Sequence, residues 1–185
     1  MDNRKKHTLS LGLSALCAAI TAAGAQITIP IFVPITLQVF GVFLAGYILG
    51  PKWGAFSMLI YLITGLAGLP VFANAQGSIS VIFLPTFGYL LAFPISAFAI
   101  GAISKTRFCN GIKIILSISL GIVIIYTFGV IWLLVWSKYI VHKPMSLIVA
   151  ISVGVFPFII IDIFKGIAAY YIAKSIPKRI FAKLK

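Results

Sequence analysis

Acidic side chains are almost absent from this chain of 185 residues, which contains only Asp2 and Asp162 and no glutamate. Its two histidines, His7 and His142, stand alone and lack the spacing of metal ligands. General acid–base catalysis and metal catalysis rely on carboxylates and imidazoles, so both are poorly supplied here. The sequence also lacks a Walker phosphate-binding loop and the GxSxG and HExxH motifs. We therefore expect no enzyme activity, no ATP hydrolysis by this chain, no metal site and no cofactor.

Charged residues as a whole are scarce, at 9% of the chain, against 62% hydrophobic residues and a mean hydropathy of +1.17. Soluble domains carry roughly 25% charged residues, and a chain of this length cannot bury so much apolar surface. The composition therefore excludes a soluble protein and predicts an integral membrane protein embedded in a lipid bilayer. The net charge of +13 does not indicate nucleic-acid binding, because the basic residues cluster between apolar runs.

Long apolar runs dominate the sequence, and a helix needs about 20 such residues to cross a membrane. Six candidate runs are residues 8–28, 35–49, 53–69, 84–103, 112–136 and 145–171. Prolines and glycines divide them: an irregular segment is expected at 30–34, a turn at 50–52, and helix kinks at Pro94 and Pro157. The predicted fold class is an all-α integral membrane protein with six transmembrane helices.

The domain organisation follows from the same runs. Residues 8–174 are predicted to form one six-helix membrane domain between a short tail at 1–7 and a basic tail at 175–185. The first run resembles a signal peptide that ends in the small residues 23–25. Because the apolar stretch continues beyond those residues and the rest of the chain is also membrane-like, we expect the first helix to be retained.

Basic residues predict the orientation of the helices, since cytoplasmic flanks are rich in Lys and Arg. They gather on one side of the six-helix scheme, at residues 4–6, 52, 105–113 and 174–185. The loops on the opposite side hold only Lys138 and Lys143. The protein is therefore expected in a bacterial cell (plasma) membrane with both termini on the cytoplasmic side, and the loop around residues 74–80 is expected outside.

Two opposite charges, Asp162 and Lys165, lie within the last apolar run. Residues three apart share one face of a helix, and an ionisable residue at hydrocarbon depth is a functional-site hypothesis by default. One interpretation is a purely structural salt bridge inside the bundle. The other is a polar site, suited to a ligand that both donates and accepts hydrogen bonds, to a zwitterion or to a proton pathway.

The few remaining polar residues gather on the outer side of the predicted topology. They are Gln26, Thr28, Thr36, Gln38, Asn74, Gln76, Ser78, Ser80, Thr86 and Tyr89. We expect a pocket that opens outward beneath these loops, with Asp162 and Lys165 at its depth. Trp132 and Trp136 are interpreted as anchors at the membrane interface or as residues that line the pocket.

Small residues recur in the first helix at a spacing of four, in the pairs Ala15/Ala19, Ala18/Ala22 and Ala19/Ala23. This spacing lets another helix approach closely. The pattern indicates either packing inside the bundle or a flat face for a partner membrane protein, with Ala15, Ala19 and Ala23 as the candidate contact residues.

Several short runs together resemble the BioY family. They are PITLQ at 34–38, LGPKWG at 49–54, GLAGLPVFA at 65–73, Gln76-Gly77, Pro85-Thr86, Gly88-Tyr89-Leu90, Phe93 and Asp162-x-x-Lys165. The resemblance covers roughly residues 8–175. The chain departs from the pattern at Asn74, Ala75 and Phe87, which stand where glycines are usual.

The resemblance implies a six-helix S component of an energy-coupling factor (ECF) transporter that binds biotin from outside with high affinity. It also implies a membrane T component and two ATPase subunits as partners, the ATPases using ATP, although some BioY proteins are reported to act without them. The alanine face fits the surface that S components present to the T component.

The expected substrate-binding residues are Asp162, Lys165, Gln76 and Tyr89, carried over by motif, together with Asn74 and Gln38 from the outer polar set. Asp162 would accept from a ureido N–H and Lys165 would donate to the ureido carbonyl, or Lys165 would instead hold the valerate carboxylate. The alternative functions are a solo, proton- or ion-coupled vitamin importer, and a membrane enzyme or scaffold protein that does not transport.

Overall fold

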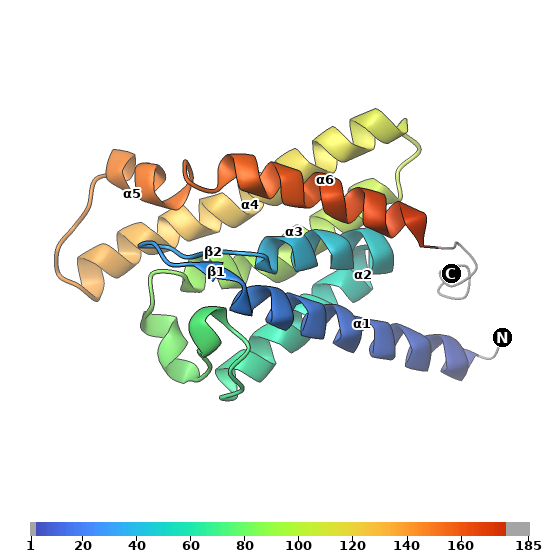
Figure 1. The fold of residues 1–185 in the computed structure, drawn as a ribbon, viewed down its shortest axis with the longest axis horizontal. Coiled ribbons are helices and arrows are strands. Elements are labelled where there is room, and N and C mark those ends of the chain that lie inside the picture. The colour runs from blue at the N-terminus through green and yellow to red at the C-terminus, as the bar shows by residue number, and fades with distance from the viewer. Residues whose placement is uncertain (1–2, 177–185) are drawn as a thin grey trace.

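The computed structural model describes residues 3–176, which form a helical bundle (Figure 1). Its α-helices are α1 (Asn3–Gln26), α2 (Gln38–Leu66), α3 (Phe87–Ser104), α4 (Asn110–Tyr139), α5 (Leu147–Gly154) and α6 (Ile159–Ser175). Two short 3-10 helices, Ala73–Ala75 and Ile79–Phe83, lie between α2 and α3. The predicted all-α class is confirmed. The tail predicted at 175–185 falls almost entirely outside the described residues.

The segment α2 is a helical hairpin rather than one straight helix. Its backbone reverses at Gly50, which has φ 76° and ψ −172°, directly before Pro51. The reversal brings the Nε2 of Gln38 within 2.5 Å of the Tyr61 hydroxyl, whereas a straight helix would separate these residues by roughly 34 Å. Glycine is required at the reversal because a positive φ is unfavourable for residues with a Cβ. The predicted turn at 50–52 is confirmed.

By length and composition, α1, α3 and α4 could each cross a membrane, and α2 meets the same criterion only when its two arms are counted together. The pair α5 and α6 also qualifies if it is counted as one broken span. Large apolar side chains, among them Ile148 and Phe164, lie exposed on the outer surface of the bundle. Inside it, hydroxyl groups bond to neighbouring helices, as where Ser57 Oγ donates to the carbonyl of Ser14 at 2.7 Å. Apolar surface outside and satisfied polar groups inside are typical of proteins that lie in a membrane.

The last span is broken, as the sequence predicted from Pro157. Helices α5 and α6 meet at an angle of 45° across residues 155–158. Proline lacks an N–H and clashes with the preceding turn, so the helix ends before it and begins again after it. Helix α3 continues through Pro94 without a break, and the kink predicted there stays a prediction.

The segment between α1 and α2 contains the irregular stretch that was predicted at 30–34. Residues 30–34 have neither helix nor strand, as predicted, and they connect strands β1 (Thr28–Ile29) and β2 (Ile35–Thr36), which pair antiparallel in a small hairpin. This β-hairpin and the 3-10 segments lie at one end of the bundle, whereas the start of α1 and the end of α6 lie at the other end (Figure 1). The β-hairpin and the 3-10 segments therefore lie together at one end of the bundle.

Candidate ligand-binding site

A cavity of about 220 Å³ lies beneath the β-hairpin and the loop that precedes α3. Its walls come from both loops and from α2, α3, α4 and α6. A single water needs only about 10–15 Å³ of such space, so this cavity has room for a small organic molecule. All six residues proposed from the sequence line it, namely Gln38, Asn74, Gln76, Tyr89, Asp162 and Lys165.

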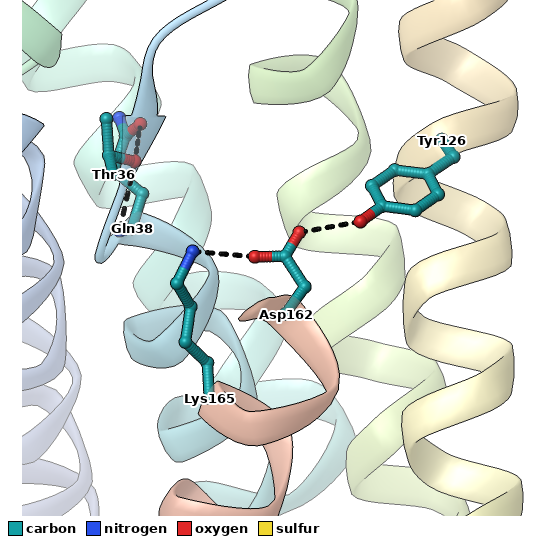
Figure 2. Close-up of polar contacts among 5 residues, drawn as sticks. All are labelled: Thr36, Gln38, Tyr126, Asp162 and Lys165. Carbon is teal, nitrogen blue, oxygen red and sulfur yellow. Dashed lines mark hydrogen bonds and ion pairs between the residues drawn. The ribbon is translucent and has the colours of Figure 1, made fainter. Parts of the chain in front are cut away.

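The charged pair lies at the depth of this cavity, in the first turns of α6. Lys165 Nζ donates to Asp162 Oδ1 at 2.6 Å, and the two side chains are only 7% and 3% exposed (Figure 2). The proline break starts α6 immediately before Asp162, which places the carboxylate near the positive end of the helix dipole. The expectation that spacing of three residues directs both groups to one place is confirmed.

Tyr126 of α4 completes the charged cluster. Its hydroxyl donates to Asp162 Oδ2 at 2.9 Å, so each carboxylate oxygen has one partner of its own (Figure 2). Tyr126 also lines the cavity. The sequence analysis missed it, because it is one of seven tyrosines and lies in a long apolar helix without a motif around it. Its hydroxyl at mid-span was the only available signal.

Gln38 is buried at the start of α2 with its amide held on both sides. Thr36 Oγ1 donates to Gln38 Oε1 at 2.7 Å, and Gln38 Nε2 donates to the Tyr61 hydroxyl. The Tyr61 hydroxyl in turn donates to the backbone carbonyl of Val71 at 3.0 Å. This chain of hydrogen bonds fixes the orientation of the Gln38 amide at the cavity wall (Thr36 and Gln38 in Figure 2).

Tyr89 lines the cavity from α3, but its hydroxyl is directed to another part of the fold. It donates to the backbone carbonyl of Gly154 at 2.9 Å, at the end of α5. The break after α5 leaves carbonyls without helical partners, and Tyr89 satisfies one of them. The aromatic ring of Tyr89 therefore forms part of the cavity wall, and its hydroxyl holds the end of α5 at the break in the last span.

Asn74 and Gln76 lie at the mouth of the cavity and are both exposed. Asn74 has φ 58° and the next residue, Ala75, has φ 55°. These left-handed conformations favour glycine, which agrees with the glycines expected from the resemblance at these two of the three departures. Asn tolerates such a conformation better than Ala does.

Gln26, at the end of α1, joins the loops over the cavity. Its Nε2 donates to the carbonyls of Pro70 and Phe72 at 3.3 and 3.2 Å, and its Oε1 accepts from the N–H of Ala75 at 3.1 Å. Thr28 of β1 adds a bond from its hydroxyl to Asn74 Oδ1 at 3.3 Å. The β-hairpin and the loop after α2 are therefore tied together above the site.

The two tryptophans hold the loop before α3 rather than line the cavity. Trp132 Nε1 donates to the carbonyl of Leu84, and Trp136 Nε1 donates to the carbonyl of Phe83, both at 2.8 Å. Neither is among the described residues that form the cavity wall. The interpretation of these residues as pocket lining is wrong, and their role here is to anchor a loop.

The alanines of α1 separate into two sets. Ala15, Ala19 and Ala23 are exposed on the outer surface, whereas Ala18 is buried and Ala22 is partly buried against the bundle. One set packs inside the bundle, and the other leaves a flat strip on its surface. The contact with a partner protein considered for the exposed set stays a prediction.

These features define a membrane protein with a small cavity, a buried charged cluster at its depth, polar side chains at its mouth and loops above it. A family model described as BioY family matches residues 1–182. The chain is 42% identical to a probable biotin transporter BioY of Pyrococcus horikoshii, over 90% of this chain and 94% of that protein. It is 39% identical to a biotin transporter BioY of Thermotoga maritima, over 89% and 94%.

A solved structure agrees with these sequence comparisons. The S-component for biotin from an ECF-type ABC transporter, determined by crystallography at 2.1 Å, matches with a TM-score of 0.78 and 29% identity. The match covers 94% of this chain and 93% of that one. The chain belongs to the BioY family.

Proposed function

We propose that this protein binds biotin and serves in its uptake, as the substrate-binding component of an ECF-type transporter. Its relatives are named as biotin transporters, and the similar solved structure is an S-component for biotin. The observation that carries the proposal is the cluster of Asp162, Lys165 and Tyr126 at the depth of a cavity sized for a small molecule.

The free hydrogen-bonding capacity of this cluster suits the ureido ring of biotin. An ionised carboxylate offers about four acceptor positions and a lysine ammonium has three donors. Asp162 uses one position on each oxygen, and Lys165 uses one donor. Asp162 can therefore accept from a ureido N–H, and Lys165 can donate to the ureido carbonyl.

Charge balance favours this orientation over one with the valerate at Lys165. Asp162 and Lys165 form a neutral unit, and they are the only charged side chains among the described residues that line the cavity. A neutral ureido ring leaves the buried site neutral. A valerate there would place a second carboxylate beside Asp162 and leave a buried net negative charge, which is costly at this depth.

The rest of biotin then extends toward the mouth of the cavity. Its thiophane ring and alkyl chain would lie against the apolar wall, which includes Val39, Leu90 and Phe93. The valerate carboxylate would reach Asn74 and Gln76, which are exposed and carry amide N–H donors. In this arrangement the charged end of biotin remains close to water.

The proposed topology has six passes through the plasma membrane, with both termini on the cytoplasmic side. The two arms of α2 run in opposite directions and count as two passes, and the broken pair α5 and α6 counts as one. An even number of passes agrees with the position of the start of α1 and the end of α6 at one end of the bundle (Figure 1). Residues 8–174 form the membrane domain in this proposal.

The energy source would lie outside this chain. The sequence contains no Walker phosphate-binding loop, so ATP would be hydrolysed by two ATPase subunits of the ECF module. A membrane T component would connect them to this protein. The exposed strip of Ala15, Ala19 and Ala23 is the proposed contact with the T component, because small side chains permit close helix approach.

Two measurements test the proposed function. Labelled biotin should bind the purified protein with nanomolar affinity, and absence of saturable binding would contradict the proposal. Cells that lack other biotin uptake should accumulate biotin when this protein is produced with a T component and ATPases. Accumulation of the same size without those subunits would instead support a solo importer, and binding without any uptake would support a protein that does not transport.

A further inference from the structure

We infer that Tyr126 is a positioning residue of this site: its hydroxyl fixes the orientation of the Asp162 carboxylate and thereby sets how well that carboxylate receives an N–H donor of the ligand. The inference rests on the proposed function, since it concerns the binding of the ureido ring. It assigns a role to a residue on α4, although the charged pair itself lies wholly on α6.

The geometry shows why the ion pair alone does not fix the carboxylate. The final torsion of an aspartate is broad and roughly two-fold, so the carboxylate rotates easily about it. Lys165 reaches Oδ1 at 2.6 Å from the same helix, at the end of a flexible four-carbon side chain. A single flexible partner permits the pair to rotate together.

Tyr126 supplies a second partner of a different kind. It reaches the other oxygen, Oδ2, at 2.9 Å from the neighbouring helix α4. Its side chain is buried and rigid, with only two torsions before the hydroxyl. Holding both oxygens from two helices fixes the plane of the carboxylate, so that its remaining acceptor positions keep one direction relative to the cavity (Figure 2).

Tyr89 provides a matched comparison within the same cavity. It also lines the wall and is also buried, but its hydroxyl donates to the carbonyl of Gly154 rather than to Asp162. Loss of the Tyr89 hydroxyl removes a bond that holds the end of α5. Loss of the Tyr126 hydroxyl removes a bond that orients Asp162, the proposed hydrogen-bond acceptor for the ligand.

The test compares Tyr126→Phe with Tyr89→Phe in the purified full-length protein. Biotin dissociation constants are measured by calorimetry, together with the thermal unfolding of each variant. Tyr126→Phe should weaken biotin binding by about tenfold or more, because it removes a hydrogen bond to a buried charged group. Tyr89→Phe should lower the unfolding temperature, and it should change the affinity for biotin and for analogues that lack a ring N–H by the same factor, because the Tyr89 hydroxyl bonds to the Gly154 carbonyl and not to Asp162.

A second ligand separates positioning from general damage to the fold. Two carbamate analogues of biotin, each with one ring N–H replaced by oxygen, are measured on the unaltered protein and on Tyr126→Phe. For the analogue that lacks the N–H received by Asp162, the Tyr126→Phe penalty should be several-fold smaller than for biotin, as in a double-mutant cycle.

Two results would overturn the inference. One is an equal penalty for biotin and for both carbamates, which indicates a structural role. The other is unchanged biotin affinity in Tyr126→Phe when the unaltered protein binds normally. Failure of the unaltered protein to bind biotin would be a different result, because it would overturn the proposed function itself and this inference with it.

Discussion

Gln26 Oε1 accepts a hydrogen bond from the backbone N–H of Ala75 at 3.1 Å, and this bond connects the end of α1 to a loop 49 residues further along the chain. The same side chain donates to the carbonyls of Pro70 and Phe72. The end of α1 therefore holds in place the loop that lies over the cavity.

Gln26→Ala removes all three of these bonds and should release biotin faster. Opening of the cover is expected to become about three- to tenfold more frequent, because each exposed bond contributes roughly 0.5–1.5 kcal/mol and part of it is replaced by water. Exchange of bound labelled biotin measures the dissociation rate. Ser80→Ala is the matched control, since the Ser80 hydroxyl bonds only within its own loop, to Ser78. Equal dissociation rates for both variants would contradict the fastening role.

Ala75→Gly should stabilise the protein, because Ala75 has φ 55°. A residue with a Cβ costs roughly 1–2 kcal/mol in this left-handed region and glycine does not, so the free energy of unfolding should rise by about 1 kcal/mol. Thermal unfolding in detergent measures the change. Ala73→Gly is the control in the same short 3-10 helix, at a residue outside the positive-φ set. There glycine should be neutral or destabilising, and an equal effect at both positions would count against the explanation.

The variants Asp162→Asn and Lys165→Met, alone and together, separate a structural ion pair from a ligand site. Each single change leaves one buried group without its charged partner and should cost about 3–5 kcal/mol of stability. The double change should recover much of the stability, because a neutral pair needs no compensation. Biotin binding, measured by calorimetry, should stay at least about a hundredfold weaker in all three. Recovery of binding in the double variant would indicate a purely structural pair.

Substitution on the exposed alanine strip should affect transport and leave binding intact. Ala19→Trp places a large side chain on the outer surface of α1, where Ala19 is exposed. Biotin affinity should stay within about twofold, because surface changes away from the core have small effects, whereas uptake with the ECF module should fall severalfold. Ile148→Trp, at a residue 78% exposed on α5, is the control and should leave uptake unchanged. Equal losses in both variants would argue against a specific partner face.

Local chemistry made some parts of this structure predictable from the sequence. The Gly50-Pro51 reversal and the break at Pro157 follow from backbone preferences that act within a few residues. The Asp162–Lys165 pair was recognisable because charge is rare in an apolar run. The polar residues of the outer loops marked the cavity mouth for the same reason.

Contacts between distant segments were not predictable in this way. The partnership of Tyr126 with Asp162 depends on how α4 packs beside α6, which no local pattern encodes. Tyr89 was expected among the pocket residues and lines the cavity, but no local pattern indicated that its hydroxyl satisfies a carbonyl left free by the break after α5. Pro94 lies inside α3, which continues through it, because a proline removes only one hydrogen bond and neighbouring helices can support the helix there.

The reversal at Gly50 also has a consequence for the surrounding lipid. The first arm of α2, from Gln38 to Leu49, rises only about 18 Å, whereas the hydrocarbon layer of a bilayer is about 30 Å thick. Every residue of this arm is buried or partly buried, because other helices surround it. Acyl chains therefore contact the outer helices, such as α4 with its exposed Ile115, rather than this short arm, so the arm is not expected to thin the bilayer.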